Sequence, residues 1–150
     1  LSALTGRRVA EIGCTAKFEF IDNHHVLFTG QLKTKNKLSD LTYTIPVLHD
    51  AKIIIETLNN LKVNFPKYLD DPYGFSANYA PNMGNVVKKY KPFVEGSITP
   101  KDLRAIYAPI AYERFCLDKR EHDTLFYTKI LGHSEKDIHT CLSYLKYKIM

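Results

Sequence analysis

The 150-residue sequence predicts a single α+β domain that is mainly helical and contains a small three-stranded antiparallel sheet. Two observations predict this fold class. Between residues 17 and 47, short runs rich in β-branched and aromatic residues alternate with polar turns, as in neighbouring antiparallel strands. Elsewhere, apolar residues recur at helical spacing between helix-start and helix-stop signals. The chain contains no internal repeat or low-complexity linker, so we expect residues 1–150 to form one domain.

The N-terminal segment 1–12 has apolar residues at helical spacing, interrupted by a glycine. We expect two helical pieces that meet at Thr5-Gly6, with a turn that directs Arg7 and Arg8 outward. Two solvated arginines are the alternative, and this segment by itself favours that alternative.

Three short strands are predicted at residues 17–21, 26–32 and 41–47. The connection between the second and third strands, Lys33–Asp40, is polar and rich in lysine. A lysine at a hairpin tip is usually solvated, but such a tip can also deliver an ammonium group into a site.

The middle of the chain favours a helix at Ala51–Leu61, with Asp50 as its N-cap and Ile54, Leu58 and Leu61 on its buried face. A loop is expected at Asn64–Pro72, and a further helix is expected to begin near Asn82 and to end near Lys91.

Thr99, Pro100 and Asp102 form a strong helix-start signal. Threonine is a good N-cap, proline fits the first turn, and a carboxylate there favours the helix dipole. Arg104 lies beside the apolar stripe of this helix, so we expect it at the rim of the core. The predicted stripe consists of Leu103, Ile106, Tyr107 and Ile110.

The C-terminal part predicts a helix at Thr124–Leu131 that ends at Gly132, and another helix that begins at Ser134. His133 would therefore be fixed between a helix end and a helix start. A lone histidine is more often structural than catalytic, but one held in this way suits proton or phosphate chemistry. Tyr144 and Tyr147 lie off the buried stripe of the last helix.

Composition excludes several classes of protein. Hydrophobic residues make up 45% of the chain and charged residues 25%, which is ordinary for a globular domain. No apolar run reaches the length of a membrane span and no signal-peptide pattern is present, so we expect no membrane partner and a cytoplasmic location. Three widely spaced cysteines and six histidines without ligand spacing predict no disulfide framework, no metal and no cofactor.

The net charge of +5 is compatible with a nucleic-acid partner, because clustered lysines suit a phosphate backbone. A solvated basic surface is the alternative, and charge alone does not separate the two. The clustered lysines are Lys33, Lys35, Lys37, Lys88, Lys89 and Lys91.

An arginine pair, a lysine, a histidine and a tyrosine together could transfer a phosphodiester. Two guanidiniums can grip the non-bridging oxygens of the phosphate and stabilise the transition state electrostatically. A lysine or histidine can supply the proton of the leaving group. A tyrosine can hold the cleaved strand covalently, which conserves the bond energy without ATP or metal.

Four segments, in the right order, resemble motifs of the tyrosine recombinases. Thr5–Ile12 is similar to the "TG-x-R-x-x-E" segment that carries the first catalytic arginine, and the match falls on Arg8 and Glu11. The three strands resemble the family's sheet, whose second hairpin carries the catalytic lysine. Lys33 best matches that lysine, with Lys35 as its rival.

The other two segments lie in the C-terminal third. Thr99–Arg104 is similar to "TPHxLR", which places Arg104 at the second arginine and Lys101 where most members have histidine. Leu131–Ser134 resembles "LGHS". The nucleophilic tyrosine of the common pattern would stand at position 142, where this sequence has Leu142, and Tyr144 follows two residues later.

Lys101 in place of histidine and the late tyrosine both depart from the common pattern, and in these features the sequence resembles the hairpin telomere resolvases, or protelomerases. Its Lys-, Asn-, Ile- and Tyr-rich composition and its Arg8–Lys33 spacing resemble the spirochaete type most. The resemblance implies a tyrosine-recombinase/type IB topoisomerase catalytic fold and double-stranded DNA as partner. It further implies two subunits that act on one telomere junction, and joining through 3′-phosphotyrosine links into closed hairpins. By resemblance, the nucleophile is Tyr144, with Tyr147 as the fallback. The DNA-binding candidates are Arg7, Lys35, Lys37, Lys88 and Lys89.

Two other interpretations remain open. An ordinary site-specific recombinase or a type IB topoisomerase would use the same chemistry and give another product. A DNA-binding module without activity could retain the fold, although every expected catalytic residue type is present. Because the sequence opens on Leu1, we expect the domain to be a fragment of a longer bacterial, nucleoid-associated protein with additional DNA-binding domains.

Overall fold

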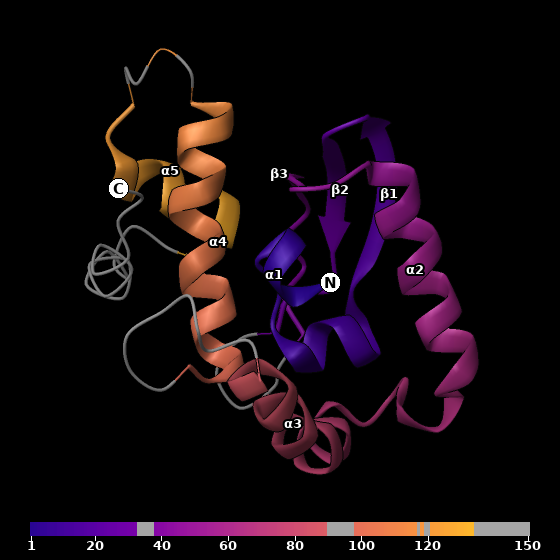
Figure 1. Cartoon of the computed structure of the whole chain (residues 1–150). Helices are drawn as coiled ribbons and strands as arrows, with labels where there is room; N and C mark the ends of the chain where they lie inside the picture. Colours follow the sequence, from indigo (N-terminus) through magenta and orange to yellow (C-terminus); the bar gives the residue numbers. More distant parts are fainter. Residues whose placement is uncertain (33–37, 90–97, 117, 119–120, 134–150) are drawn as a thin grey trace.

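The computed structural model describes residues 1–32, 38–89, 98–116, 118 and 121–133. Helices pack on both sides of a small antiparallel sheet (Figure 1). The elements are, in chain order, α1 (Ser2–Thr5), the π-helical segment η1 (Glu11–Thr15), β1 (Lys17–Asp22), β2 (His25–Thr29), β3 (Tyr43–Pro46), α2 (Ala51–Asn64), the 3₁₀ turn η3 (Pro66–Tyr68), α3 (Pro72–Lys89), α4 (Pro100–Phe115) and α5 (Asp123–Leu131).

The first two elements confirm the predicted break at Thr5-Gly6. Gly6 ends α1 in the left-handed region, with φ 66°, a conformation that glycine adopts without steric cost. A Cβ at this position would also collide with the ring of Tyr107. The glycine thus lets the turn after α1 approach α4 closely, which places the two arginines that follow.

The sheet has the order β1-β2-β3 and both pairings are antiparallel, as predicted. Phe18 lies opposite Phe28, and Val26 lies opposite Ile45. The second and third strands are shorter than predicted, because β2 ends at Thr29 and β3 begins at Tyr43. An isolated bridge between Leu32 and Leu38 closes the base of the connection that contains residues 33–37.

α2 covers one side of the sheet and confirms the predicted helix at Ala51 (Figure 1). Asp50 is its N-cap, since its Oδ1 accepts hydrogen bonds from the amides of Lys52 at 2.8 Å and Ile53 at 3.3 Å. Ile54 and Leu58 are buried against the sheet, at an upper estimate of about 2 kcal/mol of hydrophobic stabilisation for each side chain.

α3 begins at Pro72. The sequence predicted a loop up to Pro72 and a helix that begins near Asn82, so the predicted start of this helix is wrong. Asp71 Oδ1 accepts a hydrogen bond from the amide of Gly74 at 2.8 Å, so an Asp-Pro pair starts the helix in the ordinary way. Pro81 lies inside the helix. Phe75 of α3 is buried in a cluster of aromatic side chains, which holds this segment in place.

α4 begins as predicted but buries a different face. The amide of Thr99 donates to Asp102 Oδ2 at 2.9 Å, which satisfies a backbone donor at the helix start. Of the predicted apolar stripe, only Tyr107 is buried. The buried face consists largely of Arg104, Ala105, Tyr107, Ala108 and Ala111. The small side chains on this face let α4 lie close to its neighbours. The prediction missed this face because it followed the spacing of large apolar residues.

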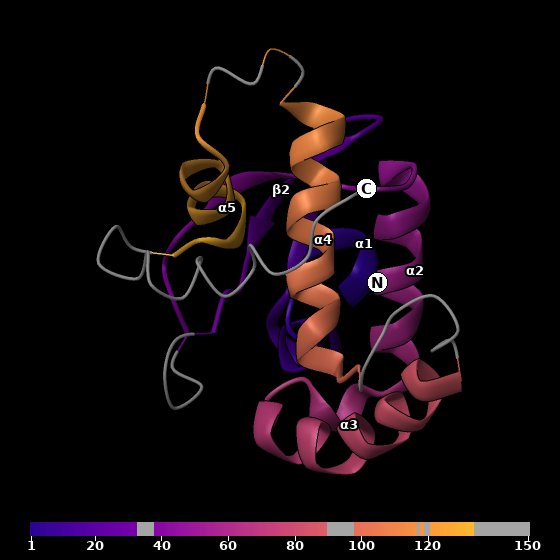
Figure 2. The same cartoon turned by 60° about the vertical axis from the view of Figure 1, so that its left-hand side comes forward.

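α5 packs against α4, with Tyr127, Ile130 and Leu131 buried in their shared core (Figure 2). It ends at Gly132, which has φ 64° as expected of a helix C′ residue. The amide of His133 donates to the carbonyl of Thr128 at 3.0 Å. His133 is therefore fixed by the helix end, as predicted; the helix expected from Ser134 lies outside the described residues.

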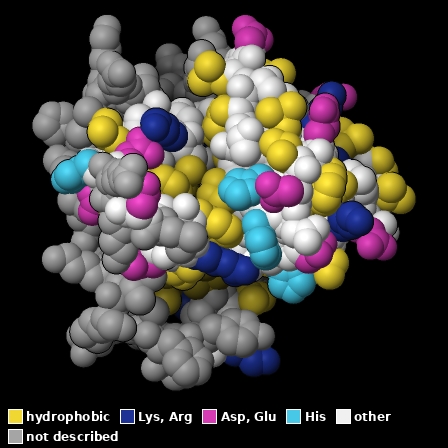
Figure 3. All heavy atoms as spheres, turned by 90° about the horizontal axis from the view of Figure 1, so that it is seen from above, with side chains coloured by type: hydrophobic (Ala, Val, Ile, Leu, Met, Phe, Trp, Pro, Cys, Tyr) yellow, Lys and Arg dark blue, Asp and Glu magenta, His cyan; other side chains and the backbone are white. Residues whose placement is uncertain are grey.

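The face at the β1–β2 turn carries histidine, acidic and hydrophobic side chains, and its lysines and arginines stand apart from one another (Figure 3). His25 Nδ1 lies 2.9 Å from Asp22 Oδ1, and the His25 ring packs on Phe115 with ring centroids 5.5 Å apart. Within the described part of the chain, no helix has both the length and the apolar character that a membrane crossing requires.

Candidate functional site

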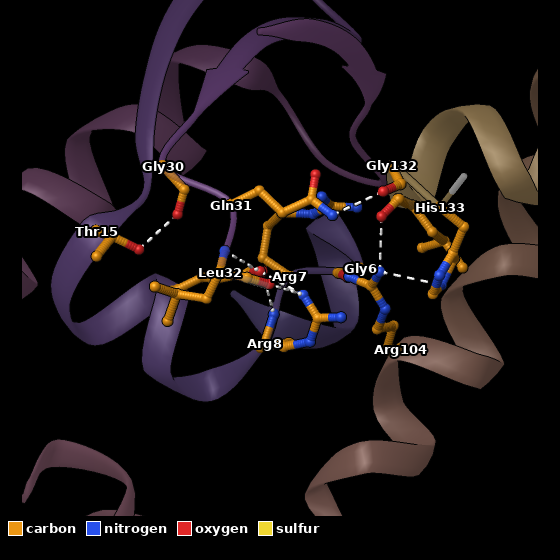
Figure 4. Close-up of polar contacts among 12 residues, drawn as sticks. Gly6, Arg7, Arg8, Thr15, Gly30, Gln31, Leu32, Arg104, Gly132 and His133 are labelled. Atoms are coloured by element: carbon orange, nitrogen blue, oxygen red, sulfur yellow. Dashed lines mark hydrogen bonds and ion pairs between the residues drawn. The ribbon is translucent and has the colours of Figure 1, made fainter. Parts of the chain in front are cut away.

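Arg8, Arg104 and His133 are brought together from three distant segments of the chain (Figure 4). Arg104, on α4, donates from Nη1 to the carbonyl of Gly6 at 2.7 Å and from Nη2 to the carbonyl of Leu131 at 2.7 Å. Its Nη2 also lies 3.4 Å from His133 Nε2. A guanidinium only donates, so Nε2 is the acceptor in this contact. The geometry thus joins the first turn, α4 and the end of α5 at one point.

Arg104 is 6% exposed and therefore lies deeper than the predicted rim of the core. Burial of a guanidinium is costly unless its donors find partners. The carbonyls of Gly6 and Leu131 supply such partners, and they also hold the side chain in one orientation.

Arg8 lies on the open side of the site. Its Nη1 donates to Glu11 Oε1 at 2.7 Å and to the carbonyl of Leu32 at 2.9 Å, and 41% of its side chain is exposed. Arg8 is thus held in place by Glu11 and by Leu32, which directly precedes Lys33. Its side chain is still accessible to a ligand.

Glu11 is fully buried and is the acidic centre of the site. It accepts hydrogen bonds from the amide of Arg8 at 2.8 Å and from the amide of Leu32 at 3.0 Å, in addition to the Arg8 side chain. Burial alone would raise the pKa of Glu11, but the positive charges of Arg7, Arg104 and Arg8 outweigh it and hold the pKa below its usual value. The carboxylate is therefore ionised at neutral pH.

Three guanidiniums surround this single carboxylate, so the site carries an excess of positive charge. Such an excess in a partly buried place favours an anion, and above all a phosphate that gains negative charge in a transition state. Among the described residues, no group of three histidine, cysteine, aspartate or glutamate side chains is arranged to hold a metal ion.

Arg7 is not a surface residue, so the prediction that the turn directs it outward is wrong. Its side chain is fully buried. Nη1 donates to Tyr43 Oη at 2.6 Å, Nη2 donates to the carbonyl of Ile130 at 2.6 Å, and the guanidinium lies 4.7 Å from the centre of the Phe28 ring. Because the turn after Gly6 directs Arg7 inward and only Arg8 outward, the two neighbouring arginines have different surroundings.

Other predicted residues are only partly described. Lys101 is exposed in the first turn of α4, and Lys88 and Lys89 are exposed at the end of α3. Several predicted residues lie outside the described part of the chain, namely Lys33, Lys35, Lys37, Tyr144 and Tyr147.

Sequence reasoning missed Gln31 and Tyr43. Gln31 Nε2 donates to the carbonyl of Gly132 at 2.7 Å, and Tyr43 Oη donates to Gln31 Oε1 at 2.9 Å. Gln31 follows β2 and Tyr43 begins β3. Neither residue carries a local signal for this role, because Gly132 and Arg7 lie far away in the sequence.

Comparison with known proteins identifies the domain. The family model described as the telomere resolvase ResT/TelK catalytic domain matches residues 1–147. The protelomerase of Escherichia phage N15 is 32% identical and that of Yersinia phage PY54 is 30% identical, over 99% and 100% of this chain. The chain spans 26% of the length of each of these relatives.

Solved structures agree with these matches. A mutant of protelomerase TelA complexed with a DNA hairpin product has a TM-score of 0.86 and 28% identity, over 99% of this chain and 51% of that one. TelA covalently complexed with substrate DNA has a TM-score of 0.83 and 27% identity over the same shares. The tyrosine-recombinase-like fold predicted from the sequence is thereby confirmed. The chain belongs to the ResT/TelK family of telomere resolvase catalytic domains.

Proposed function

We propose that this chain cleaves and rejoins DNA through a 3′-phosphotyrosine intermediate, and that it resolves replicated telomeres into covalently closed hairpin ends. The observation that carries this proposal is the cluster of Arg8, Arg104 and His133 in a domain of the telomere resolvase family. The relatives described as complexes with substrate DNA and with a hairpin product support the same substrate and product.

In the proposed reaction, Arg8 and Arg104 contact the two non-bridging oxygens of the scissile phosphate. Arg8 reaches it from the exposed side, and Arg104 from the buried side next to His133. His133 donates a hydrogen bond to the phosphate or shuttles a proton. Lys33 protonates the departing 5′ oxygen, and Tyr144 attacks the phosphorus.

The remaining basic residues have supporting roles in this proposal. Lys101, exposed at the start of α4, acts as a secondary catalytic group in the place of the usual histidine. Lys35, Lys37, Lys88 and Lys89 contact the DNA backbone. Two copies act on one junction, in the bacterial cytoplasm with the nucleoid. Since the chain spans about a quarter of its curated relatives, other domains would supply sequence specificity.

The nucleophile is tested with a Tyr144→Phe variant and a matched Tyr147→Phe variant. Each is incubated with a replicated-telomere substrate in EDTA and without ATP, and covalent protein–DNA adducts are separated on a denaturing gel. We expect adducts from the wild type and from Tyr147→Phe, and none from Tyr144→Phe, which lacks the attacking hydroxyl. Adducts from Tyr144→Phe alone would transfer the role to Tyr147. Binding without adducts in every sample would contradict the proposed function.

The product and the general acid need separate measurements. Hairpin ends on the denaturing gel support telomere resolution, whereas exchanged or relaxed DNA indicates a recombinase or topoisomerase. Lys33→Ala and Lys35→Ala are compared on a substrate with a 5′-bridging phosphorothiolate. The leaving group of this substrate needs no proton, so it should restore the activity of the variant that lacks the true general acid and not that of the other variant.

A further inference from the structure

We propose that Arg7, Tyr43 and Gln31 form a clamp that positions His133 for the reaction. This inference rests on the proposed function, because it assigns the clamp a role in that reaction. We call these three residues the Arg7 clamp.

The Arg7 clamp holds the end of α5. Arg7 donates to the carbonyl of Ile130, and Gln31 donates to the carbonyl of Gly132. Between them, Arg104 donates to the carbonyl of Leu131. Three consecutive carbonyls at the C-terminus of the helix are therefore each bound by a side chain from another segment. His133 is the next residue, so its position follows from theirs.

The members of the Arg7 clamp are linked to one another as well as to the helix. Tyr43 Oη accepts a hydrogen bond from Arg7 at 2.6 Å and donates one to Gln31 at 2.9 Å. Burial raises the pKa of the Tyr43 hydroxyl, so it keeps its proton for this bond at neutral pH. The tyrosine thus connects the two residues that grip the helix end.

An arginine is suited to this place by its shape. Its fork serves Thr5 O through Nε, Tyr43 through Nη1 and Ile130 through Nη2 at the same time. A lysine ammonium cannot present donors in these fixed directions. The cost of burying the guanidinium is offset by these partners, by the Phe28 ring and by Glu11.

The Arg7 clamp therefore acts on catalysis without contact with DNA. Arg7 is fully buried, and Arg104 makes the contact with His133. If the end of α5 shifts, His133 moves relative to Arg8, whose partners Glu11 and Leu32 lie elsewhere. It also moves relative to Arg104, which still donates to the carbonyl of Gly6. A shift of about 1 Å at a reacting group costs up to about a hundredfold in rate.

Tyr43→Phe tests the clamp with the smallest change. It removes the hydroxyl and keeps the ring contact with Phe28, so the fold should persist. In the complete protein we expect unchanged DNA affinity and a loss of between about tenfold and a hundredfold in the rate of adduct formation. Tyr112→Phe is the matched control, because its hydroxyl donates to the carbonyl of Glu121 away from the site at 2.9 Å. We expect it to leave the rate unchanged.

A double-mutant cycle distinguishes positioning from mere stability. In a His133→Ala background, Tyr43→Phe should cause no further loss of rate, because the residue that it positions is gone. A full additional loss in that background would overturn the proposal, as would an unchanged rate in Tyr43→Phe alone. Gln31→Met provides a second variant that removes the bond nearest to His133 and should show the same dependence.

A phosphorothiolate substrate identifies which group is displaced. We expect it to leave the Tyr43→Phe defect in place, since His133 acts on the phosphate and not on the leaving oxygen. Restoration would overturn the proposal and show that the clamp acts on the general acid Lys33 instead. If the wild type itself forms no adduct, the proposed function has failed, and that result is separate from every outcome of the cycle.

Discussion

Replacement of Glu11 by glutamine should destabilise the fold, because this carboxylate is the buried counter-charge of the site. Glu11 is fully buried beside Arg7, Arg8 and Arg104. A glutamine has nearly the same shape but no charge, and only one of its two terminal atoms accepts hydrogen bonds. The variant therefore removes the charge and at least one hydrogen bond without creating a cavity.

The size of the expected loss in the free energy of unfolding follows from the hydrogen-bond donors that lose their acceptor in Glu11→Gln. If the amide oxygen keeps the bonds from the Arg8 side chain and the Leu32 amide, the amide of Arg8 loses its acceptor. An unsatisfied buried donor costs about 1–3 kcal/mol. Removal of one partner of a fully buried ion pair costs about 3–5 kcal/mol, but 41% of the Arg8 side chain is exposed and water screens that interaction. We expect a total loss of about 3 kcal/mol in the free energy of unfolding.

The assay is thermal unfolding at pH 7 and at lower pH. A loss of about 3 kcal/mol corresponds to a decrease in Tm of about 6–12 °C for a chain of this size. The pKa of Glu11 is lower in the folded chain than in the unfolded one. Its contribution is complete above the unfolded pKa of about 4.3 and is lost as the pH falls through the folded pKa. The difference between wild type and variant should therefore shrink in acid.

The control is Glu56→Gln, the same chemical change on the exposed face of α2. We expect it to change the free energy of unfolding by less than about 0.5 kcal/mol. A Glu11→Gln variant as stable as the wild type would refute the assignment of Glu11 as counter-charge. A difference that stays constant from pH 7 into acid would refute the electrostatic explanation and leave only packing.

Two further predictions concern helix ends. Gly132→Ala should lower the free energy of unfolding by about 2 kcal/mol, because the residue has φ 64° and a Cβ there would collide with Tyr43 and Gln31. Urea unfolding measures this loss, and an unchanged midpoint of unfolding would contradict the prediction. Asp50→Ala should lower the free energy of unfolding by about 1 kcal/mol, since Asp50 caps two amides of α2. Asp50→Asn is the control, because it retains the cap. An equal loss in both variants would show that the cap is not the cause.

Local signals predicted the fold well wherever the controlling contacts are local. The N-cap at Asp50, the start signal at Thr99 and the helix end at Gly132 all lie where the sequence placed them. Each depends on bonds within a few residues, so the pattern of neighbouring residue types is enough. The start of α3 was missed because Pro72 was interpreted as a loop residue, although proline also fits the first turn of a helix.

Long-range contacts limited the prediction of the site. Arg8 and Arg104 were identified because the motifs around them resemble a family. Nothing in those motifs distinguishes Arg7, which points inward, from Arg8, which points outward. The bond from Arg7 to Ile130 joins residues 123 positions apart, and the bond from Gln31 to Gly132 spans 101. Such partners emerge only when the fold brings both segments together.

The burial of Arg7 also explains how a site with excess positive charge remains stable before a phosphate binds. Glu11 offsets only part of the charge of three guanidiniums. Arg7 and Arg104 both donate to carbonyls at the C-terminus of α5, which is the negative end of the helix dipole. The helix end thus compensates the two buried arginines and leaves Arg8 as the partly exposed guanidinium that the proposed function assigns to the phosphate. In this arrangement, the carbonyls that bind Arg7 and Arg104 both fix the end of α5 beside His133 and offset the charge of the two arginines.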